Sequence, residues 1–126
     1  MTCVFDASAL LAAYQREPGW ARVQQALDGS FISAVDLSEA AAELVVGGRS
    51  GDALRSDVMP TALTVVPFEA VDAFVAAALR QETRRPRVSL AERACLALAR
   101  RLDMPALSTA RAWAKLDLGI TVEAIR

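Results

Sequence analysis

Acidic side chains lie at separate places in the 126-residue sequence, each beside a short apolar run or at the start of a helical pattern. Asp6 ends the first apolar run. Asp36 and Glu39 begin the helical pattern after the second run, and Glu92 begins a later one. In an open parallel sheet, the carboxyl ends of the strands and the first turns of the following helices gather at one edge. We therefore expect carboxylates from distant parts of the chain to converge there.

The residue types present narrow the chemistry of such a cluster. The sequence has no histidine, which excludes an imidazole general base, a Ser-His-Asp triad and a zinc site that contains histidine. It has two cysteines. Carboxylates without nitrogen or sulfur ligands suit a hard divalent cation such as Mg²⁺ or Mn²⁺. Such an ion can activate water and stabilise a phosphodiester under attack. The acids therefore favour metal-assisted hydrolysis of a phosphate ester.

Some of these acids also fit a purely structural role. Asp36-x-x-Glu39 and Ser89-x-x-Glu92 both have the spacing of a helix capping box, in which each acid would stabilise its helix by about 1 kcal/mol. Asp6 has a weaker structural explanation, because a carboxylate that ends a buried strand is unfavourable unless it is paired or hydrogen-bonded. Asp6 is the stronger candidate ligand, while capping and metal binding both stay open for Glu39 and Glu92.

Hydroxyl and guanidinium groups near the same edge add candidates for substrate binding. Ser8 lies two residues after Asp6, where its hydroxyl either orients that carboxylate or caps the next helix. Ser108 and Thr109 follow a later apolar run and are either caps or site hydroxyls. Arg93 is the favoured phosphate contact, because arginine binds phosphate through two parallel hydrogen bonds. A charged loop adds further cations that could contact a nucleic-acid backbone: Arg80, Arg84, Arg85 and Arg87.

Short strands and helices alternate along the chain and must position these groups. Apolar, β-favouring runs predict strands at residues 2–6, 31–34, 63–66, 104–107 and 120–122. Helical patterns cover residues 8–15, 18–28, 36–46, 51–58, 69–81, 89–102 and 110–117. This alternation is typical of a parallel sheet covered on both faces. We expect a single domain over residues 1–126, an α/β protein with a three-layer α/β/α sandwich around a central, mostly parallel sheet.

Composition and charge limit the cellular setting. The formal net charge is −1, so no global charge indicates a nucleic-acid or membrane partner. No apolar run approaches the roughly 20 residues that span a bilayer, and the N-terminus lacks the pattern of a signal peptide. Two cysteines are too few for a disulfide scaffold. These features predict a cytoplasmic protein that does not associate with membranes.

Four segments resemble, in the same order, the signature blocks of PilT N-terminal (PIN) domain proteins, and within them of the VapC toxins of type II toxin–antitoxin modules. The segments are Val4–Leu10, Ile32–Glu39, Ser89–Ala99 and Leu107–Trp113. The resemblance implies a PIN-like fold and a metal-dependent endoribonuclease, a hydrolase that cuts RNA phosphodiester bonds and inhibits growth. It also implies a cognate small antitoxin of the VapB type and a homodimer.

The resemblance implies a ligand set, with one departure. Asp6, Glu39 and Glu92 match acids that hold Mg²⁺ or Mn²⁺ and carry catalysis, although the position of Glu92 is usually Asp. The family's fourth acid stands directly before Arg111, and here that residue is Ala110. Three readings follow: a naturally weakened nuclease, a nuclease silenced by replacement at this position, or a catalytically dead PIN-fold binding protein. A metal phosphohydrolase acting on small substrates is a more distant alternative.

Overall fold

Five parallel strands form a single sheet in the computed structural model, which describes residues 2–49, 51–58, 62–84 and 87–126. The strand order is β3-β2-β1-β4-β5, and every pairing is parallel. The strands are β1 (Val4–Phe5), β2 (Phe31–Ser33), β3 (Thr64–Val66), β4 (Ala106–Ser108) and β5 (Val122–Ala124). The central position of β1 explains why its apolar pair, Val4 and Phe5, is fully buried.

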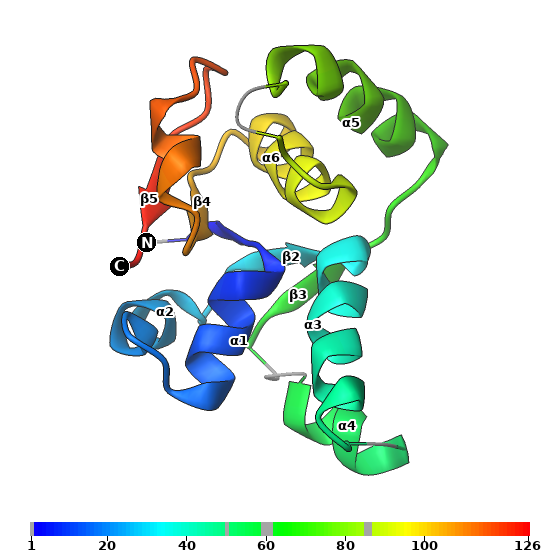
Figure 1. Cartoon of the computed structure of the whole chain (residues 1–126), viewed down its shortest axis with the longest axis vertical. Coiled ribbons are helices and arrows are strands. Elements are labelled where there is room, and N and C mark those ends of the chain that lie inside the picture. The colour runs from blue at the N-terminus through cyan, green and yellow to red at the C-terminus, as the bar shows by residue number, and fades with distance from the viewer. Residues whose placement is uncertain (1, 50, 59–61, 85–86) are drawn as a thin grey trace.

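Helices cover both faces of this sheet, as Figure 1 shows. On one face lie α1 (Ala7–Gln15), α2 (Trp20–Ala26), α3 (Ala34–Val46) and α4 (Gly51–Val58). On the other face lie α5 (Ala70–Glu82) and α6 (Leu90–Leu102), and a 3-10 helix, η1 (Arg111–Lys115), connects β4 to β5. The three-layer α/β/α sandwich is therefore confirmed, with a sheet that is parallel throughout.

Two apolar cores lie on opposite faces of the sheet. Cys3 and Phe5 pack with α1, α2 and α3, whereas Val4 packs with α5 and α6. This division follows from the alternation of side chains along a strand. The alanine-rich helix α6 is buried along most of its length, where Cys95 and Leu96 are fully enclosed. The small side chains let α6 lie close to the sheet, and this brings its first turn to the edge where the strands end.

Several predicted boundaries are wrong by a few residues, and two of the differences have a clear cause. The helix predicted at 36–46 begins at Ala34, because the Ser33 hydroxyl accepts the backbone N–H of Val35 at 3.2 Å and caps the helix directly after β2. The helix predicted at 110–117 is the single 3-10 turn η1. It ends early because the backbone at Leu116 is extended.

The last two strands begin two residues later than the runs at 104–107 and 120–122 predict. Across the described ranges, no helix is both long enough and apolar enough to cross a bilayer.

Candidate functional site

Asp6 is held in a fixed orientation at the carboxyl end of β1. Its Oδ1 accepts hydrogen bonds from the Ala9 backbone N–H at 2.8 Å and from the Ser8 hydroxyl at 2.7 Å. Its Oδ2 accepts one from the Ser108 hydroxyl at 2.6 Å. The side chain is 3% exposed and also caps α1. Burial raises the pKa of Asp6, an effect that these three hydrogen bonds oppose and the Glu92 carboxylate reinforces.

The hydroxyls around Asp6 tie two distant segments together. The Thr109 backbone N–H donates to the Ser8 hydroxyl at 3.0 Å, and the Ala110 backbone N–H donates to the Ser108 hydroxyl at 2.9 Å. The segment after β4 is therefore fixed against the start of α1. Of the two readings of Ser8, the structure supports orientation of Asp6, because α1 is capped by Asp6 and not by Ser8.

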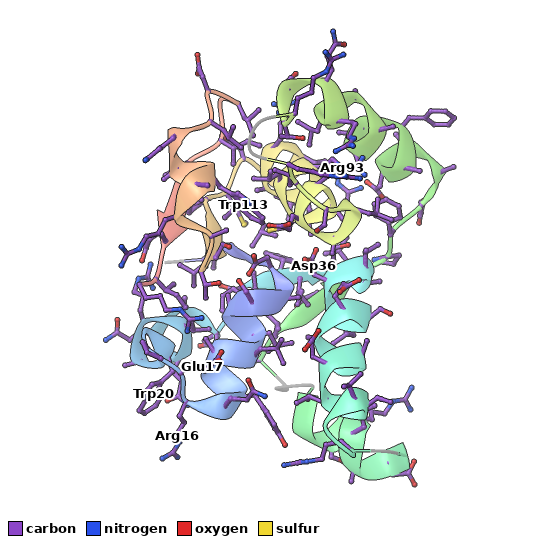
Figure 2. The ribbon with its side chains drawn as sticks, viewed as in Figure 1. Arg16, Glu17, Trp20, Asp36, Arg93 and Trp113 are labelled. Carbon is purple, nitrogen blue, oxygen red and sulfur yellow. The ribbon has the colours of Figure 1, made fainter. Side chains whose placement is uncertain are left out.

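Asp36 is a buried acid of the site, expected from the sequence to lie at this edge of the sheet but not counted among the metal ligands. Ser33 caps α3, and Asp36 lies in the first turn with no exposed surface. Its Oδ1 accepts the backbone N–H of Ala7 at 3.2 Å, and its Oδ2 is buried without a hydrogen-bond partner in the part of the chain that the structure describes. Figure 2 shows the side chain where the first turn of α3 meets α1 and α6. Burial first, and the neighbouring Asp6 carboxylate second, raise the pKa of Asp36 to about 9.

The sequence does contain a signal for the burial of Asp36. Residues four apart lie on the same face of a helix, and Asp36, Ala40 and Leu44 are the buried residues of α3. An acid on the apolar side of an amphipathic helix is unusual for a cap, which would lie before the helix. The i, i+4, i+8 spacing therefore predicts a buried carboxylate at this position.

Glu92 lies in the first turn of α6 and Glu39 in the second turn of α3, and the two differ in their present contacts. The Ser89 hydroxyl accepts the Glu92 backbone N–H at 3.2 Å, and the Glu92 carboxylate accepts the Ser89 backbone N–H at 3.0 Å. The capping box predicted for this helix is confirmed. Glu39 is exposed, and the box predicted from Asp36 to Glu39 is wrong because α3 begins at an earlier residue.

A cleft of about 270 Å³ brings these acids together at the carboxyl ends of the strands. Its lining includes the predicted acids Asp6, Glu39 and Glu92, as well as Ser8, Thr109, Ala110, Asp36, Glu43 and Ser89. The carboxylates of the cleft repel one another, and the Glu92 and Glu39 carboxylates therefore both raise the pKa of Asp36. Within the described residues, no three acids are already gathered around a common cation position. The cleft thus concentrates negative charge that a proton or a cation would relieve.

The buried Oδ2 of Asp36 indicates whether the side chains of this cleft suit a divalent cation. A buried carboxylate oxygen without a donor is unfavourable, and hard cations take carboxylate oxygens as ligands. Together with the oxygen-only donor set, this buried acceptor fits a Mg²⁺ or Mn²⁺ ion.

Arg93 does not lie in the cleft. Its Nη1 donates to the backbone carbonyl of Ala76 in α5 at 2.9 Å, and its Nε is buried without a partner among the residues described. The guanidinium thus connects α6 to α5 (Figure 2). Arg93 was expected near the phosphate because of its chemistry and its place in the sequence, but neither defines the direction of a long side chain.

A second, wider hollow of about 640 Å³ lies at the C-terminal end of α5. Its lining is basic and consists of Ala77, Arg80, Gln81, Arg84 and Arg87. The fourth arginine predicted for this loop, Arg85, lies outside the described residues.

Comparisons with known proteins agree with this fold. The PIN domain family model matches residues 3–117. The fold is similar to a toxin–antitoxin complex from Klebsiella pneumoniae, with a TM-score of 0.75, 17% identity, and 98% coverage of each chain. It is also similar to VapBC2 from Rickettsia felis bound to a promoter DNA fragment, with a TM-score of 0.74, 14% identity and 98% coverage of each chain.

A third similar structure is Mycobacterium tuberculosis VapC20, described as a Sarcin-Ricin loop cleaving toxin. Its TM-score is 0.69 at 14% identity, and the alignment covers 96% of this chain and 99% of that one. No curated protein sequence matches the chain. The family match spans nearly the whole sequence and includes every acid of the cleft. The chain therefore belongs to the PIN domain family.

Proposed function

We propose that this protein is a metal-dependent endoribonuclease toxin of the VapC type, which hydrolyses RNA phosphodiester bonds and is neutralised by a cognate antitoxin. The observation that carries the proposal is the acid-lined cleft at the carboxyl edge of a PIN-domain sheet. Similarity to toxin–antitoxin structures from three bacteria supports it. Oxygen ligands without histidine favour Mg²⁺ or Mn²⁺ over zinc.

Asp6, Glu39 and Glu92 are the proposed metal ligands and catalytic residues. A bound Mg²⁺ or Mn²⁺ would supply a water of lowered pKa and would offset negative charge at the phosphate. Asp6 needs no rearrangement for this role, because two hydroxyls and one backbone N–H already orient it. The Glu92 carboxylate would exchange its bond with the Ser89 backbone N–H for the cation.

Among the proposed substrate-binding hydroxyls, Thr109 is the best placed. Ser8 and Ser108 both donate to Asp6, so they act on substrate through the orientation of that carboxylate. Thr109 lines the cleft, and within the described residues its hydroxyl forms no hydrogen bond. We propose that it faces the RNA near the scissile phosphate. The arginines of the α5 hollow are proposed contacts for more distant phosphates, because nucleic-acid affinity depends on local cations.

Protein partners are proposed from exposed apolar surface. Phe74, which is 77% exposed, lies on α5 with two exposed valines, and two more valines lie at the end of α3. Exposed apolar patches commonly mark protein–protein contacts. We propose that contacts with the antitoxin and with a second copy of the chain use these surfaces: Val45, Val46, Val71, Phe74, Val75 and Leu90.

RNA cleavage in Mn²⁺ tests the proposed activity. Three versions of the chain are compared on a structured RNA: the sequence as printed, Asp6→Asn and Ala110→Asp. We expect weak cleavage by the first, none by Asp6→Asn, and cleavage about tenfold faster or more by Ala110→Asp, because a further carboxylate adds charge to the metal site. EDTA should abolish all cleavage.

One outcome would favour the catalytically dead binding protein instead. Ala110 is the feature on which that reading rests. If Ala110→Asp binds Mn²⁺ normally but cleaves no RNA, the nuclease proposal is wrong.

A further inference from the structure

We propose that Asp36 is a cation ligand of the cleft and supplies the carboxylate that is missing at Ala110. The inference rests on the proposed function, since it concerns the same metal site. It assigns to Asp36 a role that the family's ligand set does not give it, and it explains how a cleft without the fourth acid keeps its charge.

The two carboxylate oxygens of Asp36 differ in their contacts. Oδ1 accepts the Ala7 backbone N–H at 3.2 Å, whereas Oδ2 is buried and has no hydrogen-bond partner among the described residues. The hydrogen bond with Ala7 is a structural role for Oδ1 only. The amide oxygen of an asparagine would accept that hydrogen bond equally well. Since Ser33 already caps α3, helix capping does not explain the acid either. The second oxygen is therefore an acceptor in place for a ligand.

Hydrogen bonds also connect positions 36 and 110 to the segment that carries Asp6. Asp36 accepts the backbone N–H of Ala7, the residue directly after Asp6. The Ala110 backbone N–H donates to the Ser108 hydroxyl, which donates to Asp6. Asp36 and Ala110 both line the cleft that Asp6 also lines. A carboxylate at either position therefore adds negative charge to the same cleft.

Ionising Asp36 in this cleft is unfavourable without a cation. The Asp6, Glu92 and Glu39 carboxylates would all repel its negative charge, because like charges in a buried site repel one another. Asparagine would avoid that repulsion while keeping the contact with Ala7. A divalent cation gives the acid a function, because it attracts each carboxylate and removes the repulsion between them.

The test is Mn²⁺ affinity, measured by calorimetry on the metal-stripped 126-residue chain. The variants are Asp36→Asn, Ala110→Asp and the double variant Asp36→Asn/Ala110→Asp. Glu43→Gln is the matched control, because Glu43 lines the same cleft but is exposed. We expect Asp36→Asn to weaken Mn²⁺ binding about tenfold or more, and Glu43→Gln to change it by less than about threefold.

The double variant separates ligation from support of the fold. A carboxylate at position 110 cannot replace the contact between α3 and the Ala7 backbone, but it can replace a ligand. We therefore expect the double variant to recover Mn²⁺ affinity to within about threefold of the unchanged protein. Circular dichroism checks that each variant is folded, and Asp36→Ser provides a second substitution if Asp36→Asn does not fold.

The outcomes distinguish this inference from the proposed function. If Asp36→Asn and Asp36→Ser both bind Mn²⁺ as the unchanged protein does, while Asp6→Asn abolishes binding, the inference is wrong and the proposed metal site stands. If Asp36→Asn weakens binding but Ala110→Asp does not restore it, Asp36 only supports the fold and the inference is again wrong. If the unchanged protein binds no Mn²⁺ at millimolar concentration, both are overturned.

Discussion

Replacing Asp36 with Asn is expected to stabilise the metal-free protein at neutral and alkaline pH. The carboxyl is fully buried beside Asp6, and its pKa is raised from 3.8 to about 9. In the unfolded chain the same group ionises near pH 4. Between these two values the folded state keeps a proton that the unfolded state releases, so the free energy of unfolding falls as pH rises.

The magnitude follows from the size of the shift. Each pH unit between the two pKa values lowers the free energy of unfolding by about 1.4 kcal/mol for one such group. Between about pH 5 and about pH 8, Asp36 therefore lowers stability by up to about 4 kcal/mol. Asp6 also has a raised pKa, and its contribution has the same sign. Asp36→Asn should reduce the pH dependence of stability without abolishing it.

Urea unfolding followed by circular dichroism measures this effect, with EDTA present at each pH. The matched control is Asp28→Asn, which removes the same charge from an exposed side chain. We expect the stability gain of Asp36→Asn to grow with pH, whereas Asp28→Asn follows the unchanged protein. Parallel profiles for Asp36→Asn and the unchanged protein would refute the assignment of a buried, destabilising carboxylate.

Three further perturbations test the orientation of Asp6, the core and the basic hollow. Ser108→Ala removes a donor to Asp6 Oδ2, and urea unfolding should show a loss of about 1–3 kcal/mol; an unchanged midpoint would show that this hydrogen bond is not needed. Leu96→Ala creates a cavity in the fully buried face of α6 and should cost about 2–5 kcal/mol in the same assay, whereas a loss below that range would indicate that the core collapses around it. Replacing three arginines with Gln should weaken RNA binding and reduce the slope of log affinity against log salt by about 2, while Arg55→Gln, on exposed α4, should not; equal slopes would exclude the hollow from RNA binding. The three are Arg80, Arg84 and Arg87.

The order of strands and helices could be predicted from local patterns, because short apolar runs and amphipathic stretches alternate along the chain. Capping at Ser89 was equally predictable, since the interacting groups lie three residues apart and need no tertiary contact. Boundaries were less predictable. Ser33 is both the last residue of β2 and the N-cap of α3. Sequence alone does not show which of two nearby polar residues, Ser33 or Asp36, caps the helix.

For the site, local patterns were enough to predict that carboxylates would gather at one edge of the sheet, because parallel strands all end on that edge. The absence of histidine left oxygen atoms as the expected ligands. Which polar groups meet at that edge depends on contacts between distant elements. Ser108 reaches Asp6 across 102 positions, and Asp36 reaches Ala7 across 29. Packing between helices also brings the Arg93 guanidinium to a backbone carbonyl of α5. Side-chain direction, burial and partner choice depend on packing between elements, and no local spacing contains that information.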